Sequence, residues 1–468
     1  MVVMLVSLPL LLRGMGAAAF GLWVLVHTFS AVTGWVSLAD LGVGTATTRA
    51  ISERAANNDT DGLGRTVTSA LVVFVGVGAL CALALATVGR SFLPDLFNAP
   101  RELRAGLEIA LVCFAAQVLV DLVTEGCEAC LEGLQRVDLS RAADAVRRTV
   151  VAAATAATAL AGGGLKGVAL ASLLASAVGM VVAAALLRPE MPHGQRRPSR
   201  RVVRELLSYG RTVALLRPLG VLHRTIDRVV VGSVFGPSAV ALVEIATQIM
   251  NGAEAILSAM SYAVLPSSAW LNARGDRGTL AELVERGTKY ALLATLPAVC
   301  IGAILAGPIV HVWVGDRYIA AAAPVQVGSQ LLLGVGKAGV IVRAAAAAIV
   351  VNVVASIVLV NVVGVVGVFQ ATLLAEAVVI PPLARAMLNE VGLSCRDFVR
   401  GALLPVLAPV VALIVVAGGV ALAPLDDVTT LALGVSGGLA AYAVIALRFA
   451  VSRPELTEFR RLLARTPA

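Results

Sequence analysis

Long apolar stretches recur along the whole chain and are separated by short segments that hold most of the charged residues. A helix needs about 20 apolar residues to cross ~30 Å of hydrocarbon. The pattern predicts about fourteen spans, the first and tenth of them short: 1–12, 18–43, 67–88, 105–124, 145–161, 165–187, 211–234, 238–265, 290–313, 322–341, 344–363, 365–384, 400–423 and 429–447. Because the runs are continuous rather than alternating, they predict an all-α polytopic integral membrane protein and not a barrel.

Composition and the placement of charge support this topology. Charged residues make up 14% of the 468 residues, and the mean hydropathy is +0.90, whereas soluble domains carry about 25% charged residues. With the N-terminus in the cytoplasm, 28 of the 37 Lys and Arg fall in inner segments, as the positive-inside rule requires. The net charge of +8 therefore indicates topology and not a nucleic-acid partner. We expect a multi-pass protein of the inner (plasma) membrane with both termini cytoplasmic.

The chain also contains an internal repeat. Similar segments begin at Gly16 and Gly236, and each is followed by a span and a cytoplasmic loop with matching positions: Arg54 and Arg274, Asp59 and Asp276, Leu63 and Leu280, Arg65 and Arg286. Parallel repeats of this kind are a transporter architecture. They predict two pseudo-symmetric six-helix lobes at 1–188 (with a truncated first span) and 205–390. A basic cytoplasmic linker at 189–204 joins the lobes, and 391–468 adds two spans and a basic tail.

Three arginines in the seventh predicted span are the main candidates for binding. An arginine inside a membrane costs about 2.5–3.5 kcal/mol on insertion scales. Arg224 and Arg228 follow Arg217 by seven and eleven residues. On a helix, both steps return to within about 20° of the direction of Arg217. Such a stripe suits an anion, because guanidinium groups match phosphate oxygens. Asp227 neutralises part of the charge; in the alternative, it pairs with one arginine while the others brace neighbouring helices.

The eighth predicted span carries a polar face. Its members lie within about 120° of arc on a helix and are Glu244, Thr247, Gln248, Asn251, Glu254 and Ser258. Six aligned polar residues predict the wall of an aqueous cavity. Its carboxylates, with Asp40 on the second span, contact either sugar hydroxyls or a coupling cation, and the sequence leaves both open. His27 and His223 are further candidates for proton coupling, with hydrogen-bonded packing as the alternative.

Cysteine usage points to no cofactor. Cys127 and Cys130 form a C-x-x-C pair, but no second pair and no histidine ligand accompany it. Small apolar filler on a helix in a reducing compartment is the favoured interpretation. We therefore expect no bound cofactor apart from a possible coupling proton or cation.

Several motifs resemble a known family. Residues 8–66 (with Leu-Pro-Leu-Leu-Leu-Arg-Gly-Met-Gly, Phe-Gly-Leu-Trp and Leu-Ala-Asp-Leu-Gly-Val-Gly) resemble the start of bacterial polysaccharide-biosynthesis flippases. These are the Wzx-type translocases of the multidrug/oligosaccharidyl-lipid/polysaccharide exporter superfamily. The second half continues the resemblance with Ile226-Asp227-Arg228, Leu265-Pro266, Val312-Trp313-Val314-Gly315 and Asn352 with Ser356.

The resemblance implies two lobes around a central cavity that opens alternately to either side of the membrane. Its implied substrate is a polyprenyl-diphosphate-linked oligosaccharide for surface polysaccharide, such as lipopolysaccharide or exopolysaccharide. Membrane lipids, and possibly glycan-assembly proteins, are the implied partners.

The sequence is also compatible with other functions. A multidrug or cation antiporter of the same superfamily would be expected to offer carboxylates without three arginines. A peptidoglycan-precursor flippase shares the anionic substrate, and the short first and tenth spans also allow an inactive truncated flippase. A membrane enzyme that polymerises or ligates glycans is not expected, because the predicted outer loops are short and carry no nucleotide-binding or metal motif.

Overall fold

The computed structural model describes residues 2–31, 34–38, 42–191, 197–214, 217–249, 251, 271, 276–318, 338–451 and 455. Within these ranges the regular structure is entirely helical. Seven of the described helices are long and apolar enough to cross a membrane, and shorter apolar helices accompany them. The contacts divide the chain into unit 1, Met1–Glu244, and unit 2, Ile245–Ala468. The predicted all-α membrane fold is confirmed.

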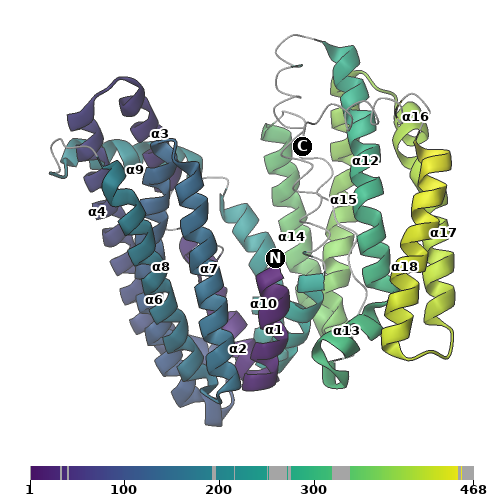
Figure 1. Ribbon diagram of the computed structural model, residues 1–468, viewed down its shortest axis with the longest axis horizontal. Coiled ribbons are helices and arrows are strands. Elements are labelled where there is room, and N and C mark those ends of the chain that lie inside the picture. The colour runs from purple at the N-terminus through teal and green to yellow at the C-terminus, as the bar shows by residue number, and fades with distance from the viewer. Residues whose placement is uncertain are drawn as a thin grey trace. The chain divides into compact units, whose positions relative to one another are not determined.

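Unit 1 is built around long helices that lie side by side (Figure 1). These are α4 (Thr60–Ala84), α6 (Arg101–Gly133), α7 (Val137–Leu160) and α8 (Gly164–Glu190). α4 continues through a π-helical turn at Leu85–Gly89 into α5 (Arg90–Leu96). The remaining elements are α1 (Val2–Met15), α2 (Ala17–His27), a 3-10 turn at Trp35–Leu38, α3 (Val43–Ala56), α9 (Arg200–Ala214), α10 (Arg217–Phe235) and the start of the helix Pro237–Ile249.

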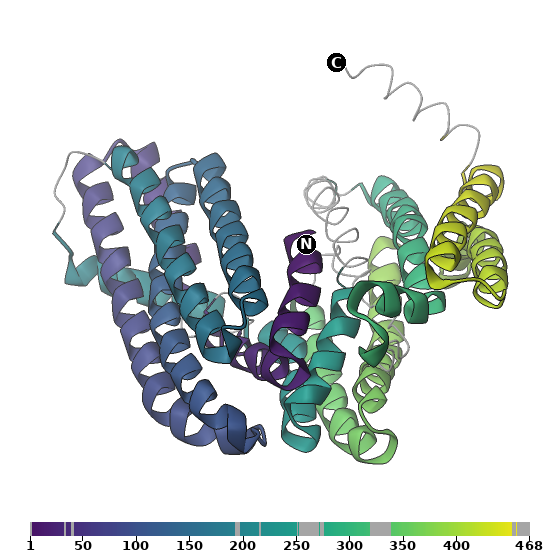
Figure 2. The same ribbon diagram turned by 60° about the horizontal axis from the view of Figure 1, so that its bottom comes forward.

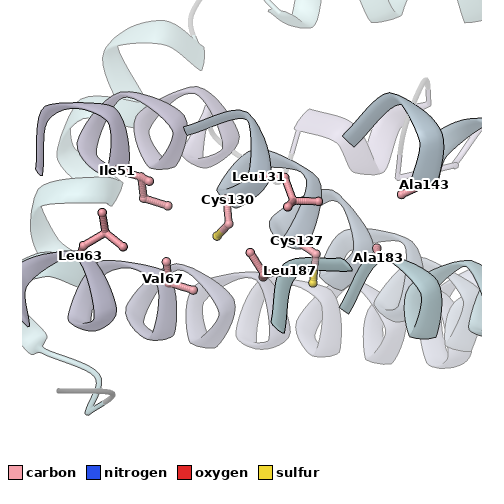
Figure 3. Packing of buried hydrophobic residues seen from close by; sticks show 9 residues of the cluster. All are labelled: Ile51, Leu63, Val67, Cys127, Cys130, Leu131, Ala143, Ala183 and Leu187. Atoms are coloured by element: carbon pink, nitrogen blue, oxygen red, sulfur yellow. The ribbon is translucent and has the colours of Figure 1, made fainter. Parts of the chain in front are cut away.

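An apolar cluster joins α3, α4, α6, α7 and α8 (Figure 3). Its members are Ile51, Leu63, Val67, Cys127, Cys130, Leu131, Ala143, Ala183 and Leu187. The two cysteines are 3% and 0% exposed and carry free thiols. Their position among leucine and isoleucine side chains gives them a packing role, which accounts for the C-x-x-C pair without a ligand.

Unit 2 contains two helix pairs that pack against the long helix α12 (Arg277–Ile304) and its short continuation α13 (Ala306–Val314). The pairs are α14 (Ala338–Val363) with α15 (Val366–Val391), and α17 (Leu404–Ala421) with α18 (Asp427–Ile445). The short α16 (Cys395–Phe398) and a π-helical turn at Val399–Leu403 lead into α17, and a second such turn, Ala446–Ala450, ends α18. The Tyr442 hydroxyl donates to the Leu293 carbonyl at 3.0 Å and ties α18 to α12.

One predicted span is interrupted within the described residues. The span expected at 18–43 is not one helix, because α2 ends at His27 and the Trp35 N–H donates to the Thr28 carbonyl at 2.9 Å. A Cβ at Gly34 would lie 2.3 Å from that carbonyl oxygen, so this turn requires glycine. Within the span expected at 211–234, the structure describes α9 as far as Ala214 and α10 from Arg217 onward, and the two residues between them lie outside the described residues. Pro218 lies in the first turn of α10, where no backbone N–H is needed. The tenth predicted span falls mostly outside the described residues.

The repeat is visible in the local backbone. Gly16 and Gly236 each precede a helix with positive φ, 79° and 80°. Asp59 and Asp276 each cap a helix, with φ/ψ of −81°/79° and −79°/80°. The Asp59 carboxylate accepts from the Gly62 N–H at 2.8 Å and that of Asp276 from the Thr279 N–H at 3.1 Å. The same chain reversal therefore enters α4 and α12. The lobe boundaries expected from the sequence stay a prediction, since the contacts divide the chain at Glu244.

We expect Asp59→Ala and Asp276→Ala each to lower the free energy of unfolding, because each removes a side-chain acceptor from a helix N-terminus. The pKa of Asp276 lies below its usual range because the Thr279 hydroxyl and N–H donate to the carboxylate. The stabilisation that the Asp276 carboxylate gives the folded state is therefore present above the unfolded-state pKa. It is lost as the pH falls through the folded-state pKa. Denaturant titration in mixed micelles measures both effects. Asp276→Asn should keep the cap and lose the pH dependence; equal destabilisation by Asn and Ala would contradict the capping role.

Candidate functional site

The three arginine positions of the predicted stripe lie on one helix. α10 is continuous from Arg217 to Phe235, so the positions 217, 224 and 228 share one side of it, as helical geometry requires. The side-chain placements of Arg217 and Arg224 lie outside what the structure describes. Arg228 is described, and its side chain is 23% exposed.

Arg228 forms an ion pair with Glu244 of the helix Pro237–Ile249. The Arg228 Nη2 atom lies 2.9 Å from Glu244 Oε2, and the Glu244 side chain is only 10% exposed. The sequence analysis expected Asp227 to neutralise part of the stripe and assigned Glu244 to a cavity wall. The structure shows that Glu244 supplies a counter-charge to Arg228, and the role of Asp227 stays a prediction. A guanidinium held by one carboxylate and still partly exposed keeps donors available to a second anion.

Two glycines allow the helices around this ion pair to approach closely. A Cβ at Gly21 of α2 would lie 1.7 Å from the Pro237 carbonyl oxygen, and a Cβ at Gly232 of α10 would lie 2.8 Å from Leu25. α2 therefore contacts both α10 and the start of the helix Pro237–Ile249. This convergence brings residues that are more than 200 positions apart in sequence to one place.

His27 lies beside the ion pair at the end of α2. Its Nδ1 atom is 3.0 Å from the Trp23 carbonyl oxygen, and its ring lies 4.0 Å from that of Trp23 and 5.0 Å from that of Phe114. Glu244 and Arg228 are close enough to act on it electrostatically. The N–H donated to Trp23 and the two aromatic neighbours favour packing, the alternative left open for His27 by the sequence.

The structure describes three further predicted site positions, Asp227, Gln248 and Asn251. Gln248 is buried and Asn251 is half-buried, and both belong to unit 2. Asp40 and Glu254 lie outside the described residues. Asp227 is half-buried on α10. Among the predicted site residues, the structure shows Arg228 and Glu244 in direct contact.

A second charged network inside unit 1 was missed by the sequence analysis. Arg147 lies near the start of the predicted span 145–161, and its side chain on α7 is only 11% exposed. Its Nη1 atom lies 3.7 Å from Asp121 Oδ1 on α6, and Nη2 lies 2.8 Å from Asp144 Oδ1. A Cβ at Gly179 of α8 would lie 2.6 Å from Arg147 Cγ, so the arginine stem packs directly on that glycine.

Gln117 joins this network, and two buried serines lie on the α8 face that carries Gly179. Gln117 Nε2 donates to Asp121 Oδ2 at 3.3 Å, and Ser172 and Ser176 of α8 are fully buried. Ser172, Ser176 and Gly179 follow the i, i+4, i+7 spacing of one helix face. That spacing was the available signal, because small and polar residues on one face of a membrane helix mark an interhelical contact. The network lies among α6, α7 and α8 and ties the three together.

We expect Arg147→Met to destabilise the protein by about 3 kcal/mol, because it leaves the buried Asp121 carboxylate without its cation. Adding Asp121→Leu should recover most of this loss, since an apolar pair of similar volume can replace a buried ion pair. Arg148→Gln, whose parent side chain is 61% exposed, is the matched control and should stay within about 0.5 kcal/mol of wild type. Unfolding in mixed micelles measures all four proteins. A double variant no more stable than Arg147→Met would contradict the assignment.

Comparison with known proteins supports this architecture. A family model described as polysaccharide biosynthesis protein matches residues 1–271, which include both charged networks. Among curated proteins, none matches the chain. A solved structure of the lipid II flippase MurJ in an inward closed conformation aligns with a TM-score of 0.71 and 13% identity, over 99% of each chain. An inward-facing multidrug resistance MATE family transporter of the MOP superfamily aligns with a TM-score of 0.65 and 16% identity, over 83% of this chain and 95% of that one. At these identities the two likenesses establish a shared fold.

Proposed function

This chain belongs to the polysaccharide biosynthesis protein family, and on that premise we propose that it is a flippase for a polyprenyl-diphosphate-linked oligosaccharide. The proposed reaction moves the lipid-linked glycan across the inner (plasma) membrane by alternating access, for surface polysaccharide synthesis. No bond is made or broken in such a step. The protein has to shield a charged, hydrated headgroup from hydrocarbon while it passes between leaflets.

The observation that carries this proposal is the ion pair between Arg228 and Glu244. A charge inside a membrane protein is costly and marks a pathway or a site by default. Arg228 shares its helix face with positions 217 and 224, and all three arginines are proposed to contact one ligand. A diphosphate carries several anionic oxygens and matches this arrangement better than a cationic drug does.

In the proposed mechanism, the diphosphate competes with Glu244 for Arg228. Before the substrate binds, Glu244 holds the guanidinium in place and offsets its charge. When phosphate oxygens take over, Glu244 is left next to a second anion, and a coupling cation would offset the added negative charge. Such an exchange would couple headgroup binding to uptake of a positive charge. Gln248, Asn251, Glu254 and Asp40 are proposed to contact the sugars or the coupling cation.

A peptidoglycan-precursor flippase is the second candidate. The MurJ structure that this fold resembles is described as a lipid II flippase, and lipid II is also an anionic lipid-linked sugar. The match to the polysaccharide biosynthesis family favours surface glycan as the substrate. Complementation of a flippase-null host, compared with complementation of a lipid II flippase-null host, separates the two.

We expect the double variant Arg224→Ala/Arg228→Ala to abolish glycan export while it still inserts into the membrane. The reason is that the anion would lose two of its three proposed cationic partners. Surface polysaccharide of a flippase-null host and the amount of protein in isolated membranes are the two measurements. Arg188→Ala, at an exposed position near the end of α8, is the matched control and should export normally. Full complementation by the double variant would refute the anion site.

Cysteine labelling tests the proposed orientation. In a cysteine-free background, Ser199→Cys should react only with reagent supplied from the cytoplasmic side. Val428→Cys should react only from the opposite side. Val428 is 63% exposed, and it is preferred to its neighbour Asp427 because Asp427 forms an ion pair with His311. The expectation follows from the distribution of Lys and Arg between the loops. Labelling of both positions from one side would overturn the topology.

A further inference from the structure

The amphipathic helix α9 is fixed to unit 1 along one face. Val202 and Leu206 are 8% and 1% exposed and form a cluster with Ala46 and Ala50 of α3 and Ala70 of α4. The small alanines allow α9 to lie close to both helices. The apolar side of α9 is therefore occupied by the protein itself.

Polar contacts fix the same helix at three further points. The Ser199 N–H donates to Ser69 Oγ at 2.9 Å. Arg54 Nη2 lies 3.3 Å from Glu205 Oε2, and the Arg49 guanidinium lies 4.6 Å above the Tyr209 ring. Apolar and polar contacts together hold α9 in a defined orientation, unlike a flexible linker.

The position of α9 corresponds to the edge of the apolar zone. In both views it runs crosswise to α4 (Figures 1 and 2). Its start is tied to Ser69, and α4 presents exposed valines at Val72 and Val75, 50% and 47% exposed. These valines begin only three residues, or about 5 Å of helix, beyond Ser69. α9 therefore lies where hydrocarbon-facing residues give way to polar ones, on the side that the positive-inside rule assigns to the cytoplasm.

The face of α9 opposite its buried side is cationic. Arg200, Arg201 and Arg204 are all exposed and fall within about 100° of arc on a helix. In the described part of the chain, none of the three makes an ion pair with a carboxylate. Leu207, 37% exposed, lies beside them on the helix surface. Three uncompensated guanidinium groups and an apolar side chain thus share one held surface.

We propose that this surface, Arg200, Arg201, Arg204 and Leu207, binds the phosphate headgroups of anionic phospholipids in the cytoplasmic leaflet. Guanidinium forks match the phosphate diester oxygens, and Leu207 reaches toward the acyl chains. Because α9 is already ordered by its contacts with α3 and α4, lipid binding does not have to order it. The site is separate from the Arg228–Glu244 pair and does not depend on the substrate proposed above.

The experiment compares lipid binding by the full-length protein in nanodiscs. Spin-labelled phosphatidylglycerol and phosphatidylcholine report the relative association of each lipid with the protein. Wild type should prefer phosphatidylglycerol, and Arg200→Gln/Arg201→Gln/Arg204→Gln should lower that preference on the order of 10- to 100-fold at low salt. Because the three residues are exposed, the variant should fold; its elution volume and thermal unfolding verify this.

The matched control removes the same charge elsewhere on unit 1. Arg141→Gln/Arg148→Gln/Arg188→Gln replaces three other exposed arginines and should keep the lipid preference. Equal loss in both triple variants would assign the effect to net charge and overturn the proposal. Unchanged preference in the α9 variant would also overturn it. Displacement of the labelled lipid by millimolar inorganic pyrophosphate would assign the site to a soluble anion instead. Glycan export by the Arg224/Arg228 variants has no bearing on this result.

Discussion

A charge that enters a membrane bundle needs an opposite charge within reach, and this requirement organises unit 1. Arg228 meets Glu244 at 2.9 Å, and Arg147 meets Asp144 at 2.8 Å with Asp121 beyond it. Removing one partner from such a set leaves an uncompensated charge, which costs several kcal/mol. The pairings therefore restrict which helix faces can turn toward one another.

The two networks differ in exposure, and the difference separates their roles. Arg147 is 11% exposed and lies among α6, α7 and α8, where both its carboxylate partners are also largely covered. Such a set ties helices together. Arg228 is twice as exposed at 23%, and it has two further arginine positions on the same helix face. A partly accessible guanidinium can exchange one anion for another, as the proposed transport of a diphosphate requires.

Close backbone approach supports both networks. Gly179 provides the surface on which the stem of Arg147 lies, and Gly21 and Gly232 bring α2 against its two neighbours near Arg228. Small residues at helix contacts are the usual means of packing in membranes, where lipid offers no hydrophobic drive for association. The buried side of α9 packs in the same way, because its Val202 and Leu206 lie against alanines of α3 and α4. Its opposite face stays cationic.

Hydropathy and the distribution of arginines were sufficient to predict a helical, multi-pass membrane protein, because every backbone polar group in hydrocarbon must be satisfied within a helix or a closed barrel. The repeat was predicted as well: Asp59 and Asp276 share a capping geometry because the same loop sequence makes the same local turn. The local turn at Gly34 divided a span that continuous hydropathy had joined. Partner choice needed the tertiary structure. Glu244 lies sixteen residues from Arg228, and Asp121 lies on a different helix from Arg147. These residues become partners only through the rotation and depth of the packed helices, which the spacing within one segment does not encode.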